Sequence, residues 1–137
     1  KALSIQQPWN WAIHYLFKPV ENRSWTTDYR GPLLTHAGKT IDPAGYDVIA
    51  ELTGRKVPKD LILGALTGWV RLVGIHHAND CAVTAGPGEP VSYCSPWAAA
   101  GQYHWEIDRP HVFVHPFPIR GQRRLWVPVP GWMRRTA

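Results

Sequence analysis

Apolar residues along the chain fall into short segments that Gly or Pro separates, and several segments alternate in the two-residue period of β-strands. The longest, residues 61–75, carries a single charge at Arg71 and is typical of a central strand. Asp108-Arg109-Pro110 predicts a break between two later strands, and residues 78–93 predict a long loop. The other expected strands are residues 2–5, 20–25, 33–37, 103–107, 112–117 and 125–127.

The first helix is expected at residues 8–17, where apolar side chains recur at three- and four-residue spacing between Pro8 and Pro19. Trp9 and Trp11 lie about 200° apart on such a helix. Only one of the two rings can therefore face the core, and the other borders a groove or solvent.

A second helix is expected from Asp42-Pro43 to about Leu52, with Asp42 as N-cap and Gly54 as C-cap. Residues 95–101 are expected to form a short turn or helix. No strand–helix–strand repeat is regular enough for a doubly wound sheet. The fold class is therefore α+β, mainly β: a small, partly open β-barrel with two or three flanking short helices. Residues 1–137 make one domain with a basic C-terminal tail from about residue 120.

The net charge of +5 is concentrated at the two ends of the chain. Residues 1–39 hold five basic and two acidic side chains, and residues 120–137 hold five arginines and no acid. If the ends meet, they form a positive face that attracts polyanions; ordinary solvated charge is the alternative. No apolar run reaches the roughly 18 residues of a membrane span, and no secretory signal is recognisable, so a cytoplasmic protein is expected.

Lys18, Glu21 and Arg23 place two cations around one carboxylate within six residues. Such neighbours favour the charged carboxylate and hold it as a fixed acceptor. Arg23 offers a planar fork that matches phosphate or base edges, whereas Lys18 acts as a point charge. A solvated surface ion pair is the alternative interpretation.

The chain holds eight Trp, five Tyr and three Phe, which serve two expected purposes. Trp69, Trp105 and Trp126 lie in apolar strands and are expected to pack in the core. Trp9 and Trp25 flank the charged group, and an aromatic ring beside cations suits base stacking.

A His-Cys-Cys metal site is a candidate because His76 and His77 shortly precede Cys81, with Cys94 further along. Zinc sites usually show closer cysteine pairs than this one. Buried or loop thiols are the favoured interpretation, and no metal or other cofactor is expected.

Ser95 and His104 invite a nucleophile-and-base interpretation. The chain has no Gly-x-Ser-x-Gly elbow, and no acid is placed to orient the histidine. Ser95 precedes a proline, which is more typical of a turn or a helix cap.

Three segments carry a resemblance to a known family: Leu3-Ser4-Ile5-Gln6-Gln7-Pro8-Trp9, Lys18-Pro19-Val20-Glu21-Asn22-Arg23-Ser24-Trp25 and Tyr29-Arg30-Gly31-Pro32-Leu33. They resemble the ASCH domain family, named for an activating signal cointegrator 1 homology region and grouped with the PUA-like folds. Its motif is Gly-x-Lys-x-x-Glu-x-Arg, and Leu16 stands here in place of the glycine. The later segments 94–98 and 104–105 are also similar, so the resemblance extends from Leu3 to about Trp126.

The resemblance implies a small PUA-like β-barrel with a cleft beside the first helix, where the Lys-x-x-Glu-x-Arg motif lies. Family members are thought to bind RNA or other nucleic acid, and some resemble an amidohydrolase acting on acetylated cytidine or a ribonuclease. In that amidohydrolase a nucleophilic threonine matches Glu21 and a lysine matches Lys18. The carboxylate of Glu21 departs from that mechanism, although it can serve as a general base or accept from a base amine.

The sequence therefore predicts a module that takes a nucleotide of RNA or single-stranded DNA, with a modified base as one possible target, into this cleft. Trp9 or Trp25 would stack on the base, Glu21 would read a base amine, and the Arg-rich tail would add salt-sensitive affinity. The expected nucleic-acid-binding residues are Gln7, Trp9, Lys18, Glu21, Arg23, Trp25, Arg30, Lys39, Ser95, Trp97 and His104.

Two other functions stay open. One is a hydrolase of a modified nucleoside or of RNA that uses Lys18 and Glu21 as an acid/base pair. The other is a domain whose aromatic surface binds a peptide.

Overall fold

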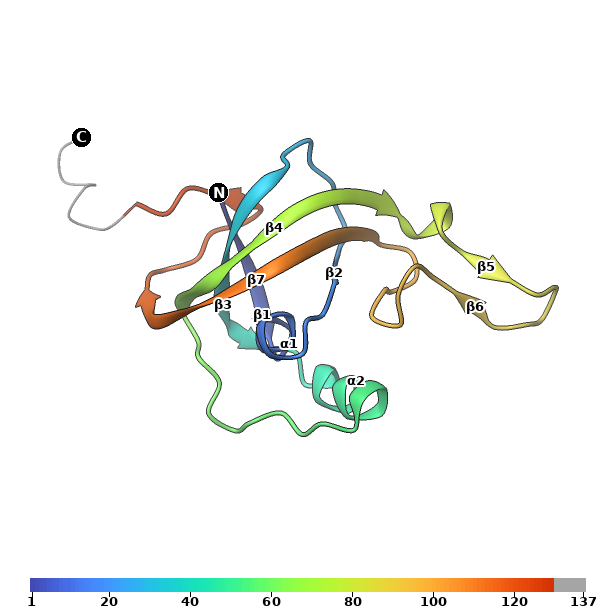
Figure 1. The fold of residues 1–137 in the computed structure, drawn as a ribbon, viewed down its shortest axis with the longest axis horizontal. Coiled ribbons are helices and arrows are strands. Elements are labelled where there is room, and N and C mark those ends of the chain that lie inside the picture. Colours follow the sequence, from blue (N-terminus) through green and yellow to red (C-terminus); the bar gives the residue numbers. More distant parts are fainter. Residues whose placement is uncertain (130–137) are drawn as a thin grey trace.

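The computed structural model describes residues 1–129 of the 137 (Figure 1). Arg134 and Arg135 of the predicted basic tail lie outside the described residues. The helices are α1 (Trp9–Tyr15), α2 (Ala44–Thr53) and the short 3-10 helix η1 (Ala78–Asp80). The strands are β1 (Ala2–Gln7), β2 (Val20–Arg23), β3 (Gly31–Ile41), β4 (Ala65–His77), β5 (Val83–Thr84), β6 (Val91–Ser92), β7 (Tyr103–Pro118) and β8 (Leu125–Trp126).

Six strands form one curved sheet in the order β2-β7-β4-β3-β1-β8, which confirms the predicted mainly-β α+β class. Neighbouring strands are antiparallel except β1 and β3, which are parallel. The sheet curls until Arg23, on edge strand β2, donates from Nη1 to the carbonyl oxygen of Ser4 on β1 at 3.3 Å. Within residues 1–129 no strand ladder joins β2 to β8, so the curved sheet is open at this seam.

The main core lies inside the curl, where α1 covers the sheet. Trp105 is fully buried at its centre, as predicted, and its indole nitrogen donates to the carbonyl oxygen of Trp25. Trp126 is also buried, whereas Trp69 is only half-buried and stacks on His111 at 4.5 Å between ring centroids. The buried residues of this core are Leu3, Ile5, Ile13, Leu33, Val70, Leu72, Trp105 and Ile107.

The predicted break at Asp108-Arg109-Pro110 is wrong, because β7 continues through it as one 16-residue strand. Arg109 adopts a positive φ of 52° and the register with β4 shifts between Trp69 and Arg71, so the strand bends at a bulge while its pairing continues. The close approach here requires glycine in β4: a Cβ on Gly68 would lie 1.9 Å from the carbonyl oxygen of His111.

The predicted loop at residues 78–93 instead contains η1 and the small antiparallel hairpin of β5 and β6. This hairpin forms an arm that extends away from the body of the molecule at the far end of β4 and β7 (Figure 1).

The two helices begin and end close to the predicted residues. After α1, Phe17 takes a positive φ of 53° and turns the chain toward β2. After α2, Gly54 caps the helix in the left-handed conformation, as predicted. The N-cap position of α2 is Pro43, but Asp42 still accepts from the backbone N–H of Ala44. No helix in the described part of the chain has the length and apolar character to cross a bilayer.

Candidate functional site

Lys18 lies at the turn between α1 and β2, and its ammonium group is buried. The backbone N–H of Lys18 donates to Ala12 O at 3.2 Å. This bond closes the end of the helix and fixes the backbone from which the Lys18 side chain extends. Only 3% of the residue is exposed, and Nζ donates to Val20 O at 2.5 Å and to Glu21 Oε1 at 3.0 Å. A buried cation needs such partners, since it has lost its contacts with water.

Glu21 completes an ion triad, the name used below for Lys18, Glu21 and Arg23. Its second carboxylate oxygen, Oε2, accepts from Arg23 Nη1 at 3.2 Å, and Glu21 itself is 5% exposed. Strand β2 fixes the carboxylate by pairing Glu21 with the buried Trp105 on β7. The triad thus joins one carboxylate to two cations and leaves one net positive charge in its surroundings.

The ion triad lines a cleft of about 460 Å³ between α1 and β2, a volume within the range of small-molecule sites. Trp9 forms part of the same wall: its Nε1 donates to Asp42 Oδ2 at 2.9 Å, and Lys18 Nζ lies 5.2 Å from its ring centroid. Gly45 lets α2 pack against this ring, since a Cβ there would lie 3.1 Å from Trp9 Cε2. The lining residues are Ser4, Gln6, Trp9, Lys18, Glu21, Asn22, Arg23, Asp42, Ala99 and Gln102.

The opposite wall of the cleft comes from residues 94–102, which Asn22 holds in place. The Asn22 amide donates from Nδ2 to Trp97 O at 2.9 Å and accepts at Oδ1 from the backbone N–H of Ala99 at 2.8 Å. This wall contributes Ala99 and Gln102 to the lining. Both contacts join residues more than 70 positions apart in the chain.

A second, more basic groove of about 690 Å³ adjoins the cleft, and Ser4 lines both. Its cations are Lys39, Arg120 and Arg123, and no acidic side chain is among the described residues that line it. His36 closes the floor, where Nδ1 shares a hydrogen bond with Ser4 Oγ and Nε2 donates to Ile119 O. The charged side chains that line this groove are therefore all cationic among the described residues, which favours an anion there.

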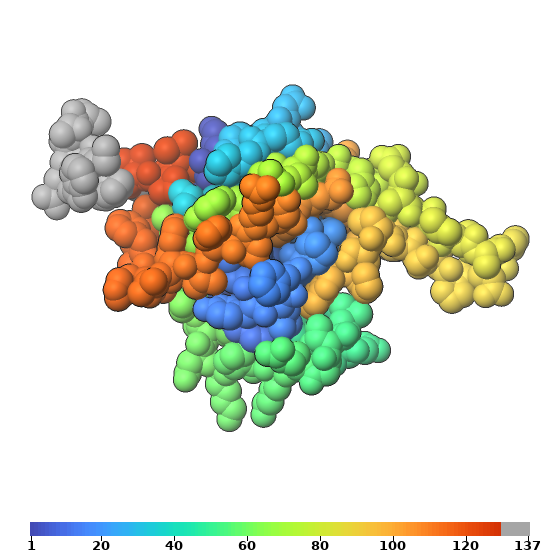
Figure 2. Space-filling view, viewed as in Figure 1, coloured from blue at the N-terminus to red at the C-terminus, as the bar shows by residue number. Residues whose placement is uncertain are grey.

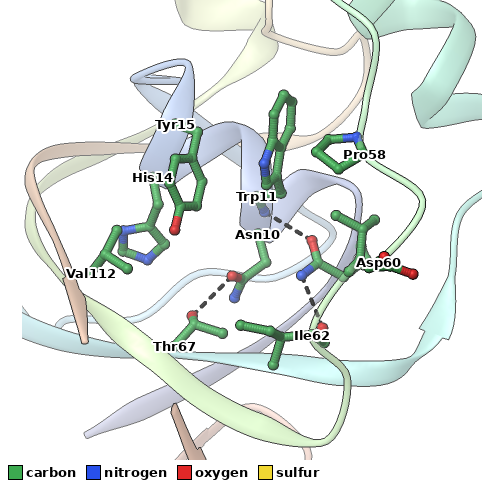
Figure 3. A pocket seen from close by; sticks show the side chains of 11 residues that line it. Asn10, Trp11, His14, Tyr15, Pro58, Asp60, Ile62, Thr67 and Val112 are labelled. Carbon is green, nitrogen blue, oxygen red and sulfur yellow. Dashed lines mark hydrogen bonds between the residues drawn. The ribbon is translucent and has the colours of Figure 1, made fainter. Parts of the chain in front are cut away.

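A small hollow of about 170 Å³ lies on the other side of α1 (Figure 3). Trp11 lines this hollow, whereas Trp9 lines the cleft of the ion triad. The two tryptophans of α1 therefore face different sides of the helix. Three hydrogen bonds connect side chains at this hollow: His14 Nε2 to Thr35 Oγ1 at 2.7 Å, Thr35 to Thr67, and Thr67 to Asn10 Oδ1 at 2.9 Å. Burial, and then the nearby His111, lower the pKa of His14 to about 4, so this ring is neutral near pH 7.

Of the residues expected to bind nucleic acid, Trp9, Lys18, Glu21 and Arg23 meet in the cleft, and Lys39 lies in the adjoining groove. The other six are not among the lining residues of either cavity. Gln7 is buried beside the small hollow, where its side chain holds Trp11 N and Ile62 O. Arg30 donates back to the carbonyl oxygens of Thr27 and Tyr29.

Trp25 packs edge-to-face on Trp105 with a centroid distance of 4.7 Å, and the guanidinium groups of Arg23 and Arg124 lie over its ring. The Trp25 ring is therefore in contact with other side chains of the protein and lies at the edge of the core. Trp97 packs on the smaller apolar cluster between α1 and α2, and its carbonyl oxygen accepts from Asn22.

The serine and histidine do not form a nucleophile–base pair. Ser95 Oγ accepts from the backbone N–H of Trp97, as expected of a turn. His104 donates from Nε2 to Ala99 O at 2.6 Å, and its Nδ1 faces Cys81, Cys94 and His76.

Sequence reasoning missed five polar residues of the cleft: Ser4, Gln6, Asn22, Asp42 and Gln102. Ser4, Gln6 and Asn22 lie inside the segments that carried the family resemblance, and their positions next to Trp9 and Glu21 were the available signal. The sequence around Gln102 gives no indication that it lines the cleft, because only the folded chain places Gln102 next to β2.

The fold and cleft define a small α+β domain with a charged cleft at the open seam of its sheet. No protein-family model matches the chain. The chain is similar to Activating signal cointegrator 1 of Mus musculus, with 30% identity over 132 residues, which is 91% of this chain and 22% of the relative. The chain thus spans about a fifth of the length of that relative. This similarity agrees with an ASCH-like domain, at the level of a distant relationship.

Proposed function

We propose that this chain is an ASCH-type domain that binds single-stranded nucleic acid and takes one unpaired nucleotide into the cleft. The similarity to Activating signal cointegrator 1 and the ASCH-type residues Lys18, Glu21 and Arg23 support the assignment to this family. The proposal rests chiefly on one observation: the ion-triad cleft and the basic groove share a border at Ser4.

This arrangement suits a base and its phosphates at neighbouring positions. Lys39, Arg120 and Arg123 present charges to phosphates, which hold a strand without reading its sequence. In the cleft, the Glu21 carboxylate is fixed by two cations and can accept from an exocyclic base amine. The Trp9 ring, held by Asp42 and Lys18, offers an aromatic surface at the same wall.

Fluorescence anisotropy with a short labelled single-stranded RNA, its DNA counterpart and a duplex tests the proposal. Three phosphate contacts give a salt slope near −2 for single strands, so affinity should fall about 10- to 20-fold between about 50 and 200 mM salt. Absence of binding to either single strand at the lower salt concentration would contradict the proposal, as would equal affinity for the duplex.

The two tryptophans of α1 provide a matched pair for the cleft itself. Trp9→Ala should weaken binding by about 1–3 kcal/mol, the usual value of one base–aromatic stack. Trp11→Ala removes the same kind of side chain from the same helix, but Trp11 borders the small hollow and not the cleft. This variant should therefore change the affinity for nucleic acid little. Equal losses in the two variants would mean that the base does not enter the cleft.

The second candidate is hydrolysis of a modified nucleoside or of RNA. The observation in its favour is the 3.0 Å contact between Lys18 Nζ and Glu21 Oε1, a potential acid/base pair inside a cleft. Incubation with acetylated cytidine and with RNA distinguishes the two functions. Product that forms with the wild-type chain and is lost in Lys18→Ala would establish the enzyme; binding without turnover supports the binding module.

A further inference from the structure

Four side chains at the base of the arm, the hairpin of β5 and β6 over residues 82–93, bring their donor atoms to one place. His76 lies near the end of β4, Cys81 follows η1, Cys94 follows β6 and His104 lies near the start of β7. Figure 2 shows the arm leaving the body of the molecule from this region. One nitrogen or sulfur atom from each residue lies within 4.8 Å of the other three; we name these residues the His/Cys cluster.

The three separations that involve His104 match the edges of a tetrahedron around zinc, and the other donor atoms lie within 4.8 Å of one another. His104 Nδ1 lies 3.5 Å from Cys81 Sγ, 3.6 Å from Cys94 Sγ and 3.2 Å from His76 Nε2. Zinc bonds of about 2.3 Å to sulfur and 2.0–2.1 Å to nitrogen, at tetrahedral angles, give edges of roughly 3.3–3.8 Å. The backbone N–H of Cys94 also points at Cys81 Sγ at 3.4 Å, a contact that stabilises thiolate sulfur.

Both histidines have a partner that turns a free nitrogen lone pair toward the centre of the cluster. His104 donates from Nε2 to Ala99 O at 2.6 Å, which leaves Nδ1 as the inward-facing electron-pair donor. Nδ1 of His76 lies 3.3 Å from Glu106 Oε2, which leaves Nε2 facing inward. Carbonyl and carboxylate groups behind the ligating histidines are the usual outer partners in zinc sites.

The neighbouring histidine shows that this orientation is specific. His77 faces away from the cluster, packs its ring edge-to-face on Tyr103 and accepts at Nδ1 from the backbone N–H of Asn79. Of the two histidines that the sequence offered for a His-Cys-Cys site, only His76 belongs to the cluster, and His104 is its second histidine.

From this geometry we propose that His76, Cys81, Cys94 and His104 bind one structural Zn²⁺ ion, independently of whether the cleft binds nucleic acid. Two sulfurs with two imidazoles select zinc over magnesium or calcium, which prefer oxygen. Four protein ligands fill a tetrahedral shell and leave no position for substrate, so the ion has a structural role. Binding converts the two thiols to thiolates and releases their protons to solvent.

The ion would close the base of the arm and stiffen one wall of the cleft. The arm starts after Cys81 and returns at Cys94, so a shared metal ion joins its two ends. From His104 the connection continues through Ala99 O, and the N–H of Ala99 donates to Asn22 on β2. Residues 94–102 are thereby held between the metal site and the ion triad.

Cobalt titration of the full chain, purified in a non-thiol reductant and stripped of metal, tests the proposal without any substitution. We expect one Co²⁺ per chain, with the intense visible bands of a tetrahedral ion and thiolate-to-cobalt charge-transfer absorption, both abolished by one equivalent of Zn²⁺. Both cysteines should become unreactive toward a thiol reagent when zinc is added. Weak bands typical of octahedral Co²⁺, or two thiols that stay reactive with zinc present, would overturn the proposal.

Matched variants then assign the ligands. His76→Ala and Cys81→Ser should each reduce zinc affinity by more than about tenfold, because even the loss of an outer partner of a ligand costs about 10- to 100-fold. His77→Ala removes an adjacent histidine and should leave affinity and the cobalt spectrum unchanged. If His77→Ala loses as much affinity as His76→Ala, the four-residue assignment is wrong. Far-UV circular dichroism of the metal-free variants confirms that each one is folded before titration.

Discussion

The ion triad and the His/Cys cluster are connected through Ala99, yet their polar atoms find partners in opposite ways. In the triad, Glu21 lies between Lys18 and Arg23, so charges of both signs are present within the chain. In the cluster, two sulfurs and two imidazole nitrogens aim lone pairs at one point, so every member is an electron-pair donor.

This difference separates a site that folding alone can complete from one that needs a component from outside. Oppositely charged groups compensate one another's loss of hydration, provided that all of them stay in place. Four facing donors repel one another unless a proton or a cation lies between them. The triad should therefore be sensitive to substitution of any one member, and the cluster to removal of metal.

The largest effect is expected when the triad loses its carboxylate. Glu21→Ala leaves the ammonium of Lys18, which is 3% exposed, without its charge partner. Removing one member of a buried pair costs about 3–5 kcal/mol. Urea unfolding followed by circular dichroism measures this loss in the free energy of unfolding.

The exposed ion pair of Arg71 and Asp108 is the control for that experiment. Its bidentate contacts of 2.9 and 2.6 Å are shorter than those of the triad, but both side chains are 41% exposed. Asp108→Ala should therefore destabilise the protein far less than Glu21→Ala. Equal losses would show that burial of the triad does not govern its contribution.

Removal of metal gives the second effect. Zinc held at 100 times its Kd adds about 2.7 kcal/mol to the stability of whatever unit its binding closes. Amide hydrogen exchange at residues 94–104 should slow by about 100-fold when zinc is added to the metal-free chain. The amides of β1 and β3 should be protected even without metal, because the main core does not include the cluster. Loss of protection throughout the chain on chelation would contradict this separation.

His14 shows a third way to bury a titratable group, since it has no counter-ion within residues 1–129 and does not belong to the His/Cys cluster. Burial lowers its pKa to about 4, against 6.5 for an unperturbed histidine. Between these two values the unfolded chain binds a proton that the folded chain does not, so stability falls as pH drops from 6.5 to 4. We expect a loss of about 3 kcal/mol across this window.

Urea unfolding at several pH values measures this dependence, with a second histidine as control. His14→Gln should flatten the curve between pH 6.5 and 4, whereas His115→Gln, on the exposed part of β7, should retain it. A curve that keeps its full slope in His14→Gln would assign the dependence to other groups.

The sequence predicted the ion triad because its members lie within six residues of one another, on one turn and one strand. It also placed both helices, since their caps and apolar spacing are local. The cluster could not be predicted in this way. His76 faces His104 because the β4–β7 ladder pairs these two residues. The register between two strands so far apart in the chain does not follow from the spacing of residues in the sequence.

The same limit explains the wrong strand break and the missed cleft wall. Asp108-Arg109-Pro110 contains the residues of a turn, but β4 continues to pair on both sides of it and converts it to a bulge. Asn22 reaches Ala99 because β2 pairs with β7, where Asn22 lies opposite His104, and nothing in the sequence near either residue signals that contact.

The smallest effect concerns the basic groove next to the triad, where the cations are exposed to solvent and would contact phosphates through water-screened charges. Lys39→Ala should reduce the magnitude of the salt slope of single-strand binding by about 0.7 and leave stability and zinc affinity unchanged. Lys59→Ala removes an exposed lysine beside another basic cavity, near α2, and should leave the slope unchanged. If Lys59→Ala lowers the slope and Lys39→Ala does not, the phosphates lie near α2. The border at Ser4 would then no longer connect a bound strand to the triad. If both variants keep the wild-type slope, neither cavity carries the backbone, and the positive charge of the cleft itself must account for any binding.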